Sequence, residues 1–198
     1  EITRIRKKKA MVLYSDIRGF TKNTRMSEEF LKESVIPNLK ECALTVEKYN
    51  GVIRQIGDLV FAYFDDEDQF SNFKNCMACA ADILMKTQIR NTYVKNFNLN
   101  IKRYVIVTGG DVFVGNVGGD EFSKELTVHG DAANMPSRID EITKDESLSE
   151  KFNSMSIIIT EQVLFFLKKC FPEVRYEILN LSNYNIQLRD FEEVKSFM

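Results

Sequence analysis

The sequence predicts an α+β domain of the ferredoxin-like kind, in which helices cover one face of a mostly antiparallel sheet. The order of apolar segments supports this class, because a strand precedes two helical stretches, a strand hairpin, a helix and a further strand. The chain has 198 residues, of which 44% are hydrophobic and 28% are charged. This length and composition are typical of one globular domain with a sizeable core, so we treat residues 1–198 as a single domain.

The elements follow from apolar runs and from the residues that interrupt them. The predicted strands occupy residues 10–17, 52–56, 59–64, 99–108, 111–117, 126–129, 156–160, 176–179 and 185–188. The predicted helices occupy residues 27–49, 68–90, 131–142 and 162–169. Pro37 is expected to kink or divide the first helix. Gly57 and Asp58 are expected at the tip of a hairpin, and Gly109 and Gly110 in a turn between two strands.

Charge and hydropathy exclude several classes of function. The net charge of -2 gives no overall field that would attract nucleic acid. No apolar run is long enough to span a bilayer, and no signal peptide is visible. Because the chain opens at Glu1, we expect a piece of a longer cytoplasmic protein with an upstream sensor or membrane segment. The basic residues within 1–9 are expected to form a solvated lead-in to the first strand.

Cys76 and Cys79 form a C-x-x-C pair inside an apolar helical run. Redox chemistry or half of a zinc site would use such a pair, but no second pair exists and His129 is the only histidine. We therefore interpret both cysteines as reduced core residues.

Two carboxylates lie where predicted strands end. Asp16 closes the first strand, and Asp58 lies at the hairpin tip. If these strands are neighbours, the two acids meet at one edge of the sheet and attract divalent cations. The turn Gly19-Phe20-Thr21 then leads into a helix, whose first N–H groups favour phosphate. A helix cap at Asp16 and a plain turn residue at Asp58 are the alternatives.

Asn134 and Arg138 lie four residues apart on a predicted helix and therefore share a face. The forked guanidinium suits phosphate oxygens, and the amide suits a ribose or phosphate oxygen. A polar pair on the surface is the alternative.

These segments, taken together and in order, resemble the class III adenylyl and guanylyl cyclases. The matching motifs are residues 15–21 (SDIRGFT), 51–58 (GVIRQIGD), 115–118 (GNVG) and 127–138 (TVHGDAANMPSR). The resemblance spans nearly the whole chain and implies the palm-type variant of the predicted fold. The implied activity is the conversion of ATP to 3′,5′-cyclic AMP and pyrophosphate.

The resemblance also implies roles for single residues. Asp16, Asp58 and the backbone carbonyl of Ile17 would hold two Mg²⁺ or Mn²⁺ ions per active site. Arg138 would stabilise charge on the α-phosphate, and Asn134 would orient the ribose.

Dimerisation follows from the same resemblance. The metal aspartates come from one subunit, and the asparagine and arginine from the other, so a homodimer would contain two shared sites. Arg189 falls where the family carries a lysine that binds the triphosphate.

Base selection depends on Arg54 and Thr127, which occupy the two positions that read the base in this family. A guanidinium cannot accept a hydrogen bond from guanine N1 or N2, but it can donate to adenine N1 or to guanine O6. ATP is therefore the favoured substrate, and a guanylyl cyclase that makes cyclic GMP is an alternative.

Three residues depart from the family pattern, namely Arg54, Pro136 and Asp190. Pro136 lies between Asn134 and Arg138, near the expected start of the helix. These departures leave a second alternative, a catalytically silent cyclase fold used for dimerisation or regulation. The string GGDEF at residues 118–122 also spells a diguanylate cyclase signature, but it does not directly follow a strand, and we interpret it as coincidence.

Overall fold

The computed structural model describes residues 5–20, 28–116, 126–145, 148, 152, 155–184, 186–188, 190–191 and 196–197. The strands are β1 (Arg6–Ser15), β2 (Val52–Ile56), β3 (Leu59–Phe64), β4 (Val105–Asn116), β5 (Leu126–His129), β6 (Ile157–Ile159), β7 (Leu179–Asn180) and β8 (Ser196–Phe197). The helices are α2 (Glu28–Phe30), α3 (Ile36–Lys48), α4 (Gln69–Tyr93), α5 (Asp131–Thr143) and α6 (Glu161–Cys170). Shorter helical turns are η1 (Leu31–Val35), η2 (Phe97–Leu99) and η3 (Leu181–Tyr184).

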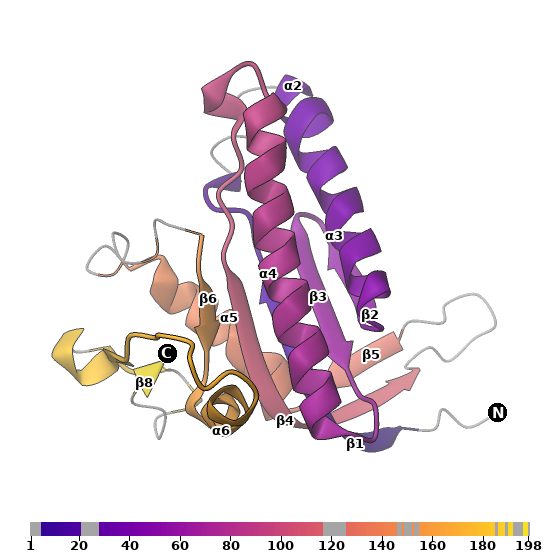
Figure 1. The fold of residues 1–198 in the computed structure, drawn as a ribbon, viewed down its shortest axis with the longest axis vertical. Helices are drawn as coiled ribbons and strands as arrows, with labels where there is room; N and C mark the ends of the chain where they lie inside the picture. Colours follow the sequence, from indigo (N-terminus) through magenta and orange to yellow (C-terminus); the bar gives the residue numbers. More distant parts are fainter. Residues whose placement is uncertain are drawn as a thin grey trace.

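The main sheet has the strand order β2-β3-β1-β4-β5, and β6 adds to β4. All of its pairs are antiparallel except β4 with β6. β1 therefore lies in the middle, between β3 and β4 (Figure 1). This position explains the continuous apolar run of β1, because residues 10–13 are at most 1% exposed.

Helices cover both faces of this sheet. Figure 1 shows α3 and α4 side by side on one face, and α6 joins them in packing on a core that includes Met11, Leu13 and Val107. α5 packs on the opposite face, where its Ile139 meets Ile106 of β4. The predicted fold class is confirmed; the expected helical layer is formed by α3, α4 and α6, and α5 adds a second layer behind the sheet.

β1 begins earlier than predicted, at Arg6. Its basic residues are paired with β4, with Lys7 opposite Phe113 and Lys8 opposite Val112. Lys7 also forms an ion pair of 2.8 Å with Asp111. Residues 6–9 therefore belong to β1 and do not merely lead up to it, while Arg6, Lys7 and Lys9 are exposed to solvent as expected.

β4 is one strand, although a turn was predicted at Gly109 and Gly110. Gly109 pairs with Met11 of β1, and a Cβ atom there would lie 2.8 Å from the Met11 sulfur. The glycine makes room for a core side chain and does not reverse the chain. The strand also starts later than predicted, at Val105, after the η2 turn.

Pro37 neither breaks nor ends the first helical stretch. The π-helical turn η1 precedes it, and the N–H of Ile36 bonds to the carbonyl of Leu31, five residues back. A proline at position 37 cannot donate to the previous turn and crowds it, and the wider turn relieves that conflict.

The predicted C-terminal strands are mostly wrong. Only Leu179 and Asn180 form the strand β7, which pairs with β8, a strand that was not predicted. Residues 186–188 are not in a strand. The interpretation of the C-x-x-C pair is confirmed, because Cys76 and Cys79 are buried and unbonded.

Candidate active site

Strand register brings the two predicted metal carboxylates together. β1 and β3 are antiparallel neighbours, and Ser15, the last residue of β1, pairs with Val60. Asp16 follows Ser15, while Asp58 precedes β3 at the tip of the β2–β3 hairpin. The carboxyl groups of Asp16 and Asp58 are in hydrogen-bonding contact. The expectation that both acids meet at one edge of the sheet is met.

This pair is electrostatically crowded. Burial, followed by the hydrogen bond to Asp16 and its negative charge, raises the pKa of Asp58 from 3.8 to about 6. One oxygen of Asp16 accepts a hydrogen bond from the backbone N–H of Ile17 at 2.9 Å. The other oxygen lies 3.7 Å from the ammonium of Lys144. Two acids held this close gain stability from a cation placed between them.

The donor set fits Mg²⁺ or Mn²⁺. Among the described residues, no group of three or more His, Cys, Asp or Glu side chains could hold a metal. Mg²⁺ is commonly held by one or two carboxylates, with waters and substrate phosphates completing its shell. Asp16 and Asp58 supply that number. Among the described residues, the carbonyl of Ile17 accepts one hydrogen bond, a long one of 3.4 Å from the N–H of Phe20, and a carbonyl oxygen has two lone pairs for ligands.

The turn that the sequence predicts after Asp16 is described as far as Phe20. Gly19 has a φ of +71°, a left-handed conformation that favours glycine. Phe20 follows it and packs against the main core. Thr21 lies outside the described residues.

Sequence reasoning missed a charged cluster beside the acidic pair. The Lys144 ammonium lies 2.6 Å from Asp140, a carboxylate that is 4% exposed, and also faces Asp16. Asp140 accepts a hydrogen bond from the hydroxyl of Tyr104. Burial raises the pKa of Asp140, and Lys144 opposes that rise. The spacing of Asp140 and Lys144 on α5 could have signalled their pairing, but not their approach to Asp16.

The second predicted pair, Asn134 and Arg138, lies on α5 as expected. Arg138 forms ion pairs of 3.0 Å with Glu141 and with Asp190. Among the described residues, no contact joins Asn134 or Arg138 to the acidic pair of the same chain. Arg138 precedes Lys144 by about 9 Å along the helix axis, at roughly 1.5 Å per residue.

Pro136 lies inside α5, deeper than the expected position near the helix start. Its ring nitrogen cannot donate to the carbonyl of Ala132, one turn earlier. That carbonyl instead accepts a hydrogen bond of 2.5 Å from the hydroxyl of Thr108 on β4. The strand thus replaces the bond that the proline removes, which keeps α5 continuous through Arg138.

The remaining predicted residues are only partly described. Arg54 lies on β2, half-buried, in register with Phe61. Thr127 lies on β5 opposite Gly115, and its side chain is outside the described residues. Arg189 and residues 118–122 are outside them as well.

An apolar cavity of about 610 Å³ lies elsewhere, between α4, β6, α6 and the segment before β7. None of the predicted site residues lines it. This separation is expected if the active site needs groups from two chains, because one chain alone then presents an open surface at the acidic pair.

Solved structures share this architecture. The adenylyl cyclase CyaB from P. aeruginosa is 22% identical, with a TM-score of 0.69 over 84% of this chain and 83% of that chain. The guanylyl cyclase Cya2 is 20% identical, with a TM-score of 0.76 over 98% of this chain and 91% of that chain. The guanylate cyclase domain of RhGC from Catenaria anguillulae, solved with GTP, is 15% identical, with a TM-score of 0.67 over 97% and 95%.

The chain therefore has the fold of class III adenylyl and guanylyl cyclase catalytic domains. No protein-family model matches the sequence, and no curated protein is similar enough to count as a relative. Within the part of the chain that the structure describes, no helix is both long and apolar enough to cross a membrane.

Proposed function

We propose that this chain is a nucleotidyl cyclase domain that converts ATP to 3′,5′-cyclic AMP and pyrophosphate at the interface of a homodimer. The observation that carries the proposal is the contact between Asp16 and Asp58 at the end of β1. A paired, partly buried acidic site of this kind suits metal-bound triphosphate. The fold, which adenylyl and guanylyl cyclases share, supports the same reading.

The two carboxylates and the carbonyl of Ile17 would hold two Mg²⁺ or Mn²⁺ ions. When bound, such ions lower the pKa of a ribose 3′-hydroxyl and neutralise charge on the phosphates. Through these ions, Asp16 and Asp58 would place the triphosphate against the turn that follows β1. The helix that the sequence predicts after Gly19 would present its first N–H groups to the phosphates.

Asn134 and Arg138 would act from the partner protomer. Arg138 would donate to the α-phosphate as charge develops during attack by the 3′-oxygen, and Asn134 would fix the ribose. Because no contact between described residues joins this pair to the acidic pair of the same chain, a twofold dimer would supply the missing half of each site. Arg189 would add a contact to the triphosphate.

ATP is the proposed substrate because of Arg54. Arg54 is half-buried on β2, the first strand of the hairpin whose tip carries Asp58. A group that only donates suits adenine N1 and leaves the N–H groups of guanine N1 and N2 without acceptors. Thr127, on β5, would accept from the adenine amino group.

A silent cyclase fold is the second candidate, and one observation favours it. Both terminal nitrogens of Arg138 are paired with carboxylates, those of Glu141 and Asp190. Two carboxylates neutralise the charge of this guanidinium, so a phosphate would have to compete with both of them.

A product assay separates the candidates. Purified protein is incubated with equal ATP or GTP and with Mn²⁺ or Mg²⁺, and cyclic products are measured across protein concentration beside an Asp16→Ala control. We expect cyclic AMP, a rate per chain that rises with concentration, and no product from the control. Nucleotide binding without turnover by a confirmed dimer would establish the silent fold, and faster turnover of GTP would reverse the base assignment.

A further inference from the structure

Arg103 is a buried cation that the proposed reaction does not use. Its side chain is 1% exposed, and it lies just before β4. The chain at this point runs beside the turn that follows β1, residues 16–19, which we call the metal-binding turn. Arg103 forms an isolated bridge with Ile17, and the N–H of Arg18 donates to the carbonyl of Lys102 at 2.9 Å. A long charged side chain is rarely enclosed in this way unless it has specific partners.

The guanidinium grips the residue that precedes Asp16. One terminal nitrogen donates to both the carbonyl and the hydroxyl oxygen of Ser15, each at 3.0 Å. The Ser15 hydroxyl in turn donates to the carbonyl of Tyr104 at 2.7 Å. The Ser15 carbonyl belongs to the peptide bond that leads into Asp16, so Arg103 fixes the orientation of that peptide plane.

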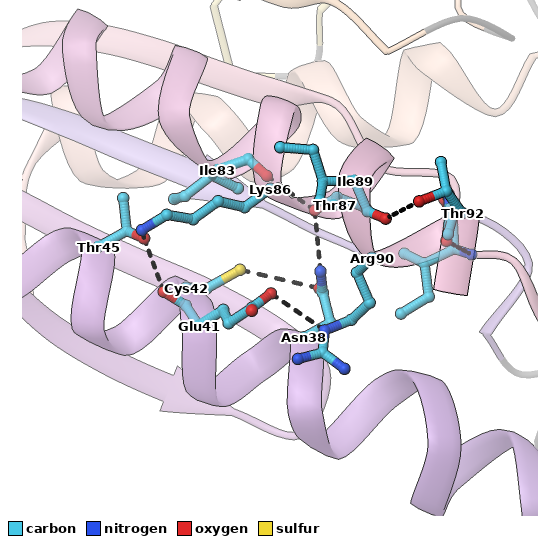
Figure 2. Close-up of polar contacts among 12 residues, drawn as sticks. Asn38, Glu41, Cys42, Thr45, Ile83, Lys86, Thr87, Ile89, Arg90 and Thr92 are labelled. Carbon is cyan, nitrogen blue, oxygen red and sulfur yellow. Dashed lines mark hydrogen bonds and ion pairs between the residues drawn. The ribbon is translucent and has the colours of Figure 1, made fainter. Parts of the chain in front are cut away.

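The other end of the fork is anchored in the helical layer. The second terminal nitrogen of Arg103 donates to the side-chain oxygen of Asn38 on α3 at 3.1 Å. Figure 2 shows the next link, in which Asn38 donates to the hydroxyl of Thr87 on α4 at 2.9 Å. Asn38 and Thr87 are fully buried. The metal-binding turn is therefore tied through one side chain to two packed helices.

The charge of Arg103 is partly balanced by the acidic pair. All three of its hydrogen-bond acceptors are neutral, and its Nε has no partner among the described residues. Burial lowers the pKa of Arg103, and Cys42, followed by Asp16 and Asp58, opposes this fall. A buried charge without a nearby counter-charge is costly, so the pair and the arginine stabilise one another.

We propose that Arg103 is the positioning residue of the metal site: its fork holds the Ser15–Asp16 peptide against α3, so that Asp16 meets Asp58 before any ion arrives. The inference rests on the proposed function only in taking Asp16 and Asp58 as metal ligands. Outer partners that orient ligands in this way typically change metal affinity by about 10–100-fold when they are removed.

The test uses Arg103→Lys, which keeps the positive charge but cannot span Ser15 and Asn38 with one ammonium. The matched control is Thr45→Val, which removes a buried hydroxyl from the same α3–α4 interface (Figure 2) without touching this network. Both variants are first compared for the free energy of unfolding. Mn²⁺ affinity is then measured by electron paramagnetic resonance, and hydrogen exchange of the Ile17 and Arg18 amides is measured without metal.

We expect Arg103→Lys to weaken Mn²⁺ binding about tenfold or more and to accelerate exchange at Ile17 and Arg18. The Mn²⁺ concentration that gives half-maximal turnover should rise in parallel, whereas the KM for nucleotide at saturating Mn²⁺ should not. Thr45→Val should leave all of these values within about twofold of the wild type, even if its free energy of unfolding falls as much as that of Arg103→Lys.

Unchanged exchange and Mn²⁺ affinity in Arg103→Lys would overturn the positioning role, as would equal changes in Thr45→Val. If Arg103→Lys fails to fold, Asn38→Asp replaces it. This variant keeps the size of the side chain and an acceptor for Arg103, but it loses the N–H that Asn38 donates to Thr87. It should change the hydrogen-exchange rates of the Ile17 and Arg18 amides. A wild type that binds Mn²⁺ and shows the expected exchange, but converts no nucleotide, would refute the proposed function and leave the positioning role standing.

Discussion

The carboxyl group of Asp58 touches that of Asp16 where the β2–β3 hairpin passes the end of β1. Two strands that pair in the middle of the sheet thus deliver two like charges to one point. The same register that buries the apolar residues of β1 therefore builds the acidic site.

The first prediction concerns pH and metal. Because burial and contact with Asp16 raise the pKa of Asp58 to about 6, the metal-free folded protein holds a proton between about pH 4 and 6 that the unfolded chain has lost. The Asp58 carboxyl group therefore stabilises the folded state at about pH 4, and this contribution to the free energy of unfolding is lost as the pH rises through about 6. Because the proposed metal site is the ionised pair, Mn²⁺ should raise Tm strongly at about pH 7.5 and little at about pH 5.

Differential scanning fluorimetry checks this dependence, with Asp58→Asn as the control. The variant should lose the Mn²⁺ effect and be more stable than the wild type without metal at about pH 7.5, because the repulsion is gone. A Mn²⁺-induced rise in Tm of the same size at both pH values would show that ions bind elsewhere.

The second prediction concerns the base. Arg54→Ala removes the donor on β2 that we assign to adenine, and it should lower kcat/KM for ATP about tenfold or more while changing the value for GTP less. Steady-state rates with each nucleotide at saturating Mn²⁺ give the ratio. If the ratio of ATP to GTP turnover stays the same, Arg54 does not read the base.

The third prediction separates packing from backbone conformation. A Cβ atom on Gly51 would lie 2.8 Å from the Phe64 ring and from a Val46 methyl group, so Gly51→Ala should cost about 1–3 kcal/mol of unfolding free energy. Gly57 has a φ of +61° and open space around it, so Gly57→Ala should cost about 1–2 kcal/mol through conformation alone. Urea denaturation measures both; an unaffected Gly51→Ala protein would mean that Phe64 can move aside.

Much of the site could be predicted, because its main residues lie at the ends of regular elements. Asp16 follows an apolar run. Asp58 lies in a hairpin whose predicted strands, 52–56 and 59–64, have the same bounds as β2 and β3 in the structure. The local sequence pattern alone therefore places both residues. The turn at Gly19, soon after Asp16, could be predicted for the same reason, because it depends on neighbouring residues in the sequence. Base and phosphate contacts at Thr127 and Arg189 stay predictions, since their side chains lie outside the described residues.

Residues that depend on packing between distant segments could not be predicted. Lys144 reaches Asp16 only because α5 packs behind the sheet, and Arg103 looks like an exposed charge in an apolar strand until α3 supplies Asn38. Likewise, Pro136 was expected near the start of its helix, and only the strand β4 reveals Thr108 as the donor that replaces the missing N–H. In each case the decisive partner is far away in the sequence.

The central claim is that the acidic pair of one protomer and Arg138 of its twin serve one nucleotide. Mixing Asp58→Asn with Arg138→Ala tests it most directly, since each protein alone should be inactive. After subunit exchange, half of the dimers are mixed and carry one intact site of two, so turnover should return to about one quarter of the wild-type rate per chain. Mixed dimers that are confirmed by mass spectrometry and yet make no cyclic nucleotide would contradict a shared site.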